Sequence, residues 1–337
     1  TVRPFLDDEA WAAVGRGGLD AAGALVRRVR VFRGTVASAG TYDAILVQRG
    51  LSLLFDGWFL HRLRRTGRPL LYDFDDAVYL PQRDGRGWLE RLRRPRATTT
   101  AFCRSASVVL AGNEYLADFA RGARRRKGAA SAVRVLPTVV DTDRFRPPPE
   151  GRTRRGTPTL GWVGSDSTLS YLESLAPALR AVQDRVPHRL LVVAGGRRPD
   201  LPGVDYGYEE WRPSDEVRYV QEIDVGLYPL DHTGWSRGKC GFKAIQYLAC
   251  GAPCVASPVG VLRDLVRPDE TGLHAASERE WIDACARLLR DREVRVGMGR
   301  RGRALVEEAY STGVAVRILG EALDQALSLS FGKGGPS

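Results

Sequence analysis

One stretch decides the fold of this chain: residues 235–257 read WSRGKCGFKAIQYLACGAPCVAS. Its glycines let the backbone approach a ligand closely, and three cations lie beside them. An apolar helical segment follows, and the free N–H groups at its start favour an anion. Because two of the chain's four lysines fall within five residues, we predict a phosphate or diphosphate cradle rather than a solvated basic loop. The cradle residues are Arg237, Lys239, Cys240, Gly241, Phe242 and Lys243.

Outward from this stretch, short apolar runs alternate with longer amphipathic ones, which is typical of parallel sheets covered by helices on both faces. The chain has 337 residues, too many for one comfortable core, so we expect two α/β domains. The predicted strands are 44–48, 69–73, 107–111 and 133–136 in the first half, and 159–163, 189–194, 225–228 and 253–256 in the second. The predicted helices include 53–66, 169–186 and 243–250.

A segment rich in proline, glycine and arginine at 147–156 separates the two halves. Its three consecutive prolines stiffen the chain, and the residues after them cannot pack a core, which predicts a domain boundary. We expect an N-terminal domain of residues 1–150 and a C-terminal domain of residues 151–330, whose last helix can pack back on the first domain. Residues 331–337 are expected to form a tail.

The start of the chain departs from the pattern of doubly wound domains. Residues 1–6 read as a strand, and no glycine-rich strand-to-helix turn precedes them. Either the first domain is irregular, or it lacks its first βα unit. A sheet that lacks this unit should expose an unpaired strand edge and favour self-association.

The run 241–260, GFKAIQYLACGAPCVASPVG, resembles the donor-site motif of GT-B-fold glycosyltransferases of family 4. Four further segments resemble the same family in the same order, namely 111–116, 135–147, 161–168 and 270–273. The resemblance implies two Rossmann-like domains facing across a cleft. It implies a nucleoside-diphosphate sugar on the C-terminal domain, an acceptor mainly on the N-terminal domain, and transfer with retention of the anomeric configuration. It also implies that neither a metal nor another cofactor is required.

The sequence departs from the family's motif at charged positions. The family has two glutamates separated by seven residues, which fall on Gly238 and Gln246 here, and the second glutamate grips the donor ribose. We expect the Gln246 amide to bond the ribose instead, and the cradle lysines to take over electrostatic work. By the same alignment Trp211 lies near the nucleobase, unless it is a buried or interdomain tryptophan. Where the family often has an Arg and a Lys, this chain offers a donor loop of Gly164, Ser165, Ser167 and Thr168.

Three carboxylates, Asp73, Asp75 and Asp76, follow the apolar strand at 69–73, where open α/β sheets place their ligands. The family resemblance puts this strand end in the cleft, so Asp75 and Asp76 would contact the acceptor or the transferred sugar. We count Asp76, with Lys239 and Lys243, as a candidate catalytic group. An Asp-x-Asp pair can also bind a divalent metal, or carry the nucleophile of a haloacid-dehalogenase-like phosphatase. Helix capping is the alternative without a functional role.

The positive charge of the chain belongs to its first half. Residues 1–150 contain 26 Lys and Arg against 16 Asp and Glu, whereas residues 151–337 contain 25 against 24. Segment 83–104 carries seven arginines close to Trp88, Leu89 and Leu92. We expect this half to dock on an anionic membrane and reach a lipid-linked or acidic acceptor, unless the arginines reflect coding bias. No nucleic-acid motif accompanies them, so no nucleic-acid partner is expected.

The remaining composition narrows the function. The five cysteines contain no CxxC pair and the four histidines are scattered, which excludes a disulfide framework and predicts no metal site. No apolar leader or membrane-length apolar run is visible, so we expect a cytoplasmic protein, at most peripheral at the inner membrane face. Sugar transfer from a nucleoside-diphosphate sugar is therefore the expected function. The alternatives are a catalytically inactive sugar-nucleotide-binding subunit and a GT-B-fold sugar-nucleotide epimerase.

Overall fold

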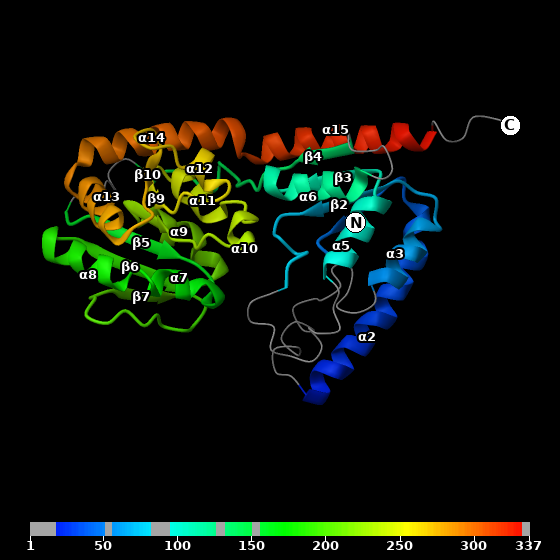
Figure 1. Ribbon diagram of the computed structural model, residues 1–337, viewed down its shortest axis with the longest axis horizontal. Coiled ribbons are helices and arrows are strands. Elements are labelled where there is room, and N and C mark those ends of the chain that lie inside the picture. The colour runs from blue at the N-terminus through cyan, green and yellow to red at the C-terminus, as the bar shows by residue number, and fades with distance from the viewer. Residues whose placement is uncertain (1–17, 51–55, 82–94, 126–131, 150–155, 332–337) are drawn as a thin grey trace. The chain divides into compact units, whose positions relative to one another are not determined.

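The chain forms two α/β units, each built on its own parallel sheet (Figure 1). A computed structural model describes residues 18–50, 56–81, 95–125, 132–149 and 156–331. Contacts within the chain assign Thr1–Leu136 and Ile318–Ser337 to the first unit and Pro137–Arg317 to the second. The predicted α/β class is confirmed.

The first unit has a four-stranded parallel sheet in the order β1-β2-β3-β4. Each strand lies within one residue of its predicted bounds: β1 (Ile45–Gln48), β2 (Leu70–Phe74), β3 (Val108–Ala111) and β4 (Val133–Val135). The helical elements described here are α2 (Gly18–Ala37), the 3-10 helix η1 (Ser38–Thr41), α3 (Asp56–Arg64), α5 (Pro95–Ser105), α6 (Glu114–Arg124) and the part of α15 (Thr312–Phe331) from Ile318 onward.

Apolar layers cover both faces of this sheet. Side chains alternate along a strand, so neighbours on β2 point to opposite faces. Leu71 packs with Ala322 and Ala326 of α15, and both alanines are fully buried. The Tyr72 ring stacks on Phe102 of α5 with 4.9 Å between ring centroids. The last helix of the chain is therefore part of the core of the first unit.

Strand β1 is an edge strand among the described strands. It pairs in parallel with β2, with Leu46 opposite Leu71. Leu46 is 51% exposed, as a side chain on a sheet edge can be. Residues 1–6 lie outside the described residues, so the strand expected there stays a prediction.

The second unit has a six-stranded parallel sheet in the order β10-β9-β8-β5-β6-β7. Its strands are β5 (Thr159–Val163), β6 (Arg189–Ala194), β7 (Gly207–Glu210), β8 (Val225–Tyr228), β9 (Cys254–Ala256) and β10 (Gly272–His274). Strand order reverses direction beside β5, which neighbours both β6 and β8. Open α/β sheets bind ligands at such a switch point, beyond the carboxyl ends of the strands.

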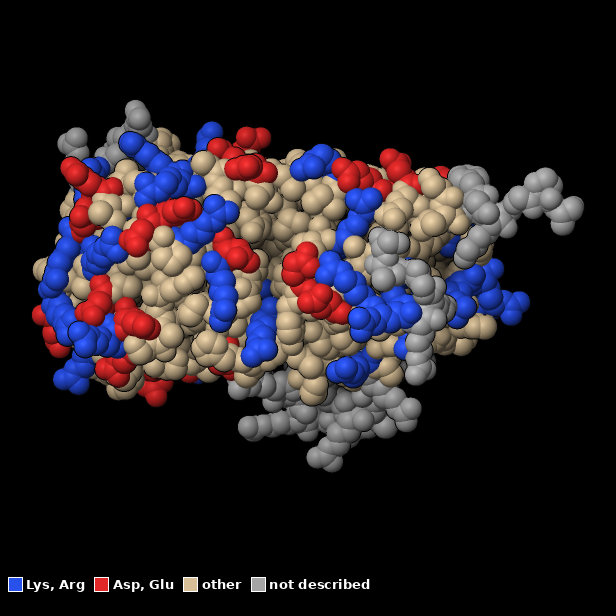
Figure 2. Space-filling view, turned by 45° about the horizontal axis from the view of Figure 1, so that its top comes forward, with Lys and Arg blue, Asp and Glu red and all other residues tan. Residues whose placement is uncertain are grey.

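Helices cover both faces of this sheet (Figure 1). The helical elements of this unit are η4 (Asp166–Thr168), α7 (Leu169–Glu173), α8 (Ala176–Arg185), η5 (Pro213–Asp215), α9 (Glu216–Gln221), α10 (Gly234–Arg237), α11 (Phe242–Ala249), α12 (Leu262–Leu265), α13 (Glu278–Arg290), α14 (Arg292–Ala309) and the start of α15. Leu160 and Trp162 of β5 belong to one core, with α8 and α13, and Val163 belongs to a second core, with α11. Over the face of this unit in Figure 2, basic and acidic side chains are interspersed.

The structure differs from two predictions about this half. The single helix expected at 169–186 is broken into α7 and α8, because Pro177 has no N–H to donate to the carbonyl of Glu173. Strands β7 and β10 were not among the predicted strands, since the sequence GYEE has no apolar run and β10 has only three residues.

The boundary between the units also differs from the predicted one at 150–151. The units divide at Leu136 and Pro137, and the segment after Pro137 packs on the second unit. The Arg303 guanidinium of α14 donates hydrogen bonds to the carbonyls of Thr142 and Phe145 in this segment, and to that of Ala249 in α11. The prolines that suggested a linker thus follow a segment already fixed to the second unit.

Candidate functional site

The cradle predicted from the sequence is a turn between two helices. Helix α10 ends at Arg237, and α11 begins after Gly241. Gly241 has a left-handed φ of 77°, and a Cβ there would lie 2.9 Å from Leu265, so only glycine fits. Gly241 is the N-cap residue of α11 and has no side chain with which to cap it. A helix start without a side-chain cap, at the switch point of the sheet, suits an anion.

Lys243, in the first turn of α11, reaches across the ends of two strands. Its Nζ donates a hydrogen bond to Thr168 Oγ1 at 3.2 Å. The same atom lies 4.2 Å from the ring centroid of Trp162 and 5.5 Å from that of Tyr228. Two aromatic faces and one hydroxyl therefore hold the ammonium group in place.

This enclosure changes the acid–base behaviour of Lys243. Burial, and then the nearby charge of Lys239, lower the pKa of its ammonium group to about 7. An anion bound in the cradle would therefore stabilise the charged form of Lys243, because it would replace the hydration that the ammonium group loses on burial. A strongly shifted pKa in a ligand-binding position is typical of a functional group.

The loop after β5 forms the other wall of the cradle. A Cβ at Gly164 would lie 2.4 Å from Lys243 Nζ, so the lysine fits because this residue is glycine. Ser165 Oγ lies 3.0 Å from Ser167 Oγ, and Thr168 Oγ1 donates to the Ser165 carbonyl. The structure thus brings the predicted donor loop and Lys243 together.

Gln246 meets a carboxylate that the sequence did not predict. Its side chain is buried, and its Nε2 donates to Glu216 Oε1 of α9 at 2.9 Å. Arg144 forms an ion pair with the same Glu216 at 3.1 Å. The amide expected to bond a ribose is therefore hydrogen-bonded to Glu216, which brings a carboxylate beside the position where the family's glutamate is expected. No local pattern signals this pairing, because the two residues come from different helices.

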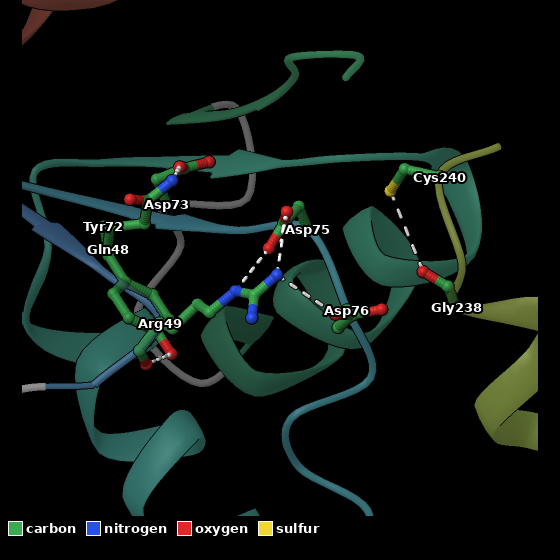
Figure 3. Close-up of polar contacts among 8 residues, drawn as sticks. All are labelled: Gln48, Arg49, Tyr72, Asp73, Asp75, Asp76, Gly238 and Cys240. Carbon is green, nitrogen blue, oxygen red and sulfur yellow. Dashed lines mark hydrogen bonds and ion pairs between the residues drawn. The ribbon is translucent and has the colours of Figure 1, made fainter. Parts of the chain in front are cut away.

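The other predicted donor residues come from separate segments of the second unit. Trp211 follows β7 and is 40% exposed, and its backbone N–H donates to the Ala194 carbonyl. Phe242 is 41% exposed at the first position of α11. Arg237 is exposed at the end of α10, and the Cys240 thiol is buried and turned to the Gly238 carbonyl (Figure 3). Their proposed roles stay predictions.

Two of the three carboxylates predicted at the end of β2, Asp75 and Asp76, bind one arginine. Arg49 follows β1, and its guanidinium donates two hydrogen bonds to Asp75 and one to Asp76 (Figure 3). Its backbone has a left-handed φ of 60°, unusual for a residue other than glycine. Tyr72 fixes this conformation by donating its hydroxyl to the Arg49 carbonyl at 2.7 Å. Sequence reasoning missed Arg49, since nothing in its own neighbourhood marks it.

Asp73 has a different environment from Asp75 and Asp76. It is buried and accepts a hydrogen bond from Gln48. Burial, and then the charge of Asp75, raise the pKa of Asp73 to about 6. The phosphatase alternative stays a prediction.

Two further expectations concern metals and membranes. Among the described residues, no group of three or more His, Cys, Asp or Glu side chains is placed to hold a metal ion. No helix in the described parts of the chain is long and apolar enough to cross a bilayer. The basic segment expected to dock on a membrane lies, from residue 83 to residue 94, outside the described residues.

Sequence comparisons find a family model that matches most of the second unit, and curated proteins that match about half of the chain. Residues 157–291 match the family model described as glycosyl transferases group 1. The chain is 30% identical over 202 residues to a GDP-mannose-dependent alpha-(1-6)-phosphatidylinositol monomannoside mannosyltransferase of Mycobacterium tuberculosis, covering 53% of this chain and 52% of that protein. It is 28% identical over 197 residues to a D-inositol 3-phosphate glycosyltransferase of Corynebacterium jeikeium, covering 50% and 46%. The chain thus spans about half the length of these relatives.

Solved structures of similar fold cover most of the chain. Sucrose-phosphate synthase of Thermosynechococcus elongatus matches with a TM-score of 0.67 and 20% identity, over 91% of this chain and 79% of its own. HepE of Anabaena, solved with UDP and glucose, matches with a TM-score of 0.64 and 17% identity, over 87% and 80%. Both are GT-B glycosyltransferases, which confirms the predicted fold. Residues 157–291 are therefore similar to the glycosyl transferases group 1 family, within a chain that has the GT-B fold.

Proposed function

We propose that the chain transfers a sugar from a nucleoside-diphosphate sugar to an acceptor, with retention of the anomeric configuration. One observation carries the proposal: an ammonium group, Lys243 Nζ, is held at the start of α11 by Trp162, Tyr228 and Thr168. A diphosphate bound there would meet a cation and the N-terminal end of a helix together. The match to the group 1 family, over residues 157–291, includes all four residues.

The chemistry of the site suits a leaving diphosphate. Negative charge builds up on the diphosphate as the bond to the sugar breaks, and fixed positive charge at that position lowers the barrier. Lys243, Lys239 and the N-terminal end of α11 would supply this charge. In the proposed reaction they act without a metal ion or another cofactor. Glu216, oriented by Gln246 and Arg144, would accept hydrogen bonds from the ribose hydroxyls.

The names of related proteins suggest donor and acceptor classes. Two relatives are named for GDP-mannose with phosphatidylinositol monomannoside and for D-inositol 3-phosphate, and HepE was solved with UDP. We therefore propose a GDP- or UDP-linked hexose as donor and a lipid-linked or acidic acceptor. Asp75 and Asp76 are proposed to contact the acceptor or the transferred sugar, with Asp76 as the candidate catalytic carboxylate.

A thermal-shift screen tests the donor. The protein is heated with UDP, GDP, ADP and dTDP sugars in turn, and one nucleotide class should raise the unfolding temperature. A ligand at a hundred times its Kd adds about 2.7 kcal/mol to the free energy of unfolding. No shift with any of the four, at millimolar concentrations, would contradict the proposal.

A catalytically inactive binding subunit is the second candidate. It is favoured by Gln246 and Gly238, which stand where the resemblance expects two glutamates. Donor binding by calorimetry without release of nucleoside diphosphate, even with a range of acceptors, would support it. Release of a free, epimerised sugar would instead indicate the epimerase alternative.

The affinity for the donor should fall as the pH rises above about 7. The pKa of Lys243 is about 7 without ligand, and a bound diphosphate raises it by favouring the charged form. Between these two values each pH unit weakens binding by up to about tenfold, because binding must first add a proton. Below pH 7 the lysine is already charged, so the affinity levels off.

Calorimetry measures this proton uptake directly. The nucleotide sugar is titrated at pH 8 in two buffers of different ionisation enthalpy, and the difference in heat gives the number of protons taken up. A Lys243→Met variant, which has no group titrating there, is the control. An affinity in the wild type that does not change between pH 7 and pH 9 would contradict the assignment.

A further inference from the structure

One surface of the first unit combines arginines with exposed apolar side chains. Helix α2 buries one side, where Phe32 and Val36 are 6% and 4% exposed. Its opposite side carries Val26 and Val31, which are 62% and 57% exposed. Arg27, Arg30 and Arg33 of the same helix are exposed as well. The exposed side of α2 therefore combines apolar and basic side chains, unlike a helix side that is only solvated.

Trp58 joins α2 to α3 on the same surface. It is 42% exposed, and the guanidinium groups of Arg33 and Arg62 lie 5.5 and 5.7 Å from its ring. Below it, Phe59 packs edge-to-face on Phe32 of α2, which fixes the two helices to each other. The indole ring is thus held near the surface between cations from both helices.

The charge of this surface is almost entirely positive. Residues 26–68 contain nine arginines and only two acidic residues, Asp43 and Asp56. Seven of the arginines are exposed on or beside α2 and α3: Arg27, Arg30, Arg33, Arg62, Arg64, Arg65 and Arg68. Figure 2 shows basic side chains gathered, with few acidic ones among them, at the right-hand end of the view.

We propose that the exposed faces of α2 and α3 dock on an anionic lipid surface. Guanidinium groups would pair with lipid phosphates, and each basic residue near such a surface adds to the attraction. Trp58 and the two exposed valines would enter the interface, where amphipathic aromatic rings are favoured. This surface differs from the segment 83–94 that the sequence suggested. The purpose of docking rests on the proposed function, because it would bring the transferase to a lipid-linked acceptor.

Nucleic acid and an acidic protein are the competing partners for a basic surface. The exposed valines and the single indole favour lipid, since nucleic-acid surfaces use several aromatics as stacking platforms. A membrane also needs no shape complementarity, and the two helices offer a basic and partly apolar surface.

Vesicle co-sedimentation of the full chain tests the proposal. We expect binding to vesicles of phosphatidylcholine with phosphatidylglycerol, no binding to phosphatidylcholine alone, and weakening as salt rises. The triple variant Arg27→Glu, Arg30→Glu and Arg33→Glu should lose at least roughly tenfold in partition to anionic vesicles. Trp58→Ser should weaken binding that remains at high salt, because it removes an apolar contribution.

A matched variant controls for net charge. Arg189→Glu, Arg292→Glu and Arg300→Glu change the charge equally at exposed positions of the second unit, and should leave vesicle binding unchanged. Binding of duplex DNA or RNA in place of vesicles would overturn the proposal, as would equal losses in the two triple variants. Donor-induced thermal shifts of each variant keep this result separate, since they report the proposed function without lipid.

Discussion

A Lys243→Met variant should lose donor binding while it stays folded. Charge-assisted hydrogen bonds contribute about 1.5–3 kcal/mol, so the Kd for a nucleoside diphosphate should rise by roughly ten- to a hundredfold. Methionine fills a similar volume between Trp162 and Tyr228 without the cost of burying a charge. Calorimetry gives the affinity, and thermal unfolding of the free protein gives the stability.

The free energy of unfolding should also depend on pH differently in the wild type and in the Lys243→Met variant. In the wild type the folded pKa of Lys243, about 7, lies below its ordinary value of 10.5. The unfolded chain therefore holds more protons in this range, and the free energy of unfolding rises with pH between these values. The variant should lack this contribution. Arg300→Met, an exposed cation on α14, is the matched control and should leave donor affinity unchanged. An unchanged Kd in Lys243→Met would remove the central support of the proposed function.

Gly164→Ala should damage the same site by a different route. The new methyl group would lie 2.4 Å from both Lys243 Nζ and the Trp162 ring. The lysine can move, but Trp162 is 1% exposed and is fixed in the core, so the loop must shift away from it. We expect loss of donor binding of at least about tenfold and a stability loss of about 1–3 kcal/mol from the added volume.

The contrast between the two substitutions makes the test specific. Lys243→Met removes charge and spares the fold, whereas Gly164→Ala keeps the lysine and strains its surroundings. Gly297→Ala is the control, because a Cβ there makes only an ordinary contact at 3.6 Å within α14. It should keep the wild-type affinity and raise stability slightly, since alanine is the better helix former. A Gly164→Ala protein with normal affinity and normal unfolding would show that the close contact is relieved without consequence.

The sequence predicted the strands better than their connections. Buried parallel strands such as β2 and β8 are continuous apolar runs, which can be recognised from composition alone. Strand β7 is partly exposed and has no such run, so it could not be recognised. The boundary was misplaced because prolines mark a stiff segment, whereas the real division depends on distant contacts such as those of Arg303.

The candidate site shows the same limit. Lys243 and the loop at Gly164 were predicted, because glycines and cations near a helix start have a recognisable spacing. Their meeting could not be predicted, since it depends on which strands are neighbours at the switch point. Glu216 and Arg49 were missed for this reason, as each acts on residues far away in the sequence.

The place of α15 has a consequence for the order in which the protein is made. Ala322 and Ala326 cover one face of the first unit's sheet, at Leu71, yet the ribosome makes them after the entire second unit. The first unit can therefore begin to fold early, but it is completed only when α15 has been made. Until then one apolar face of its sheet is not covered. A nascent chain that stalls before α15 should be a strong substrate for chaperones.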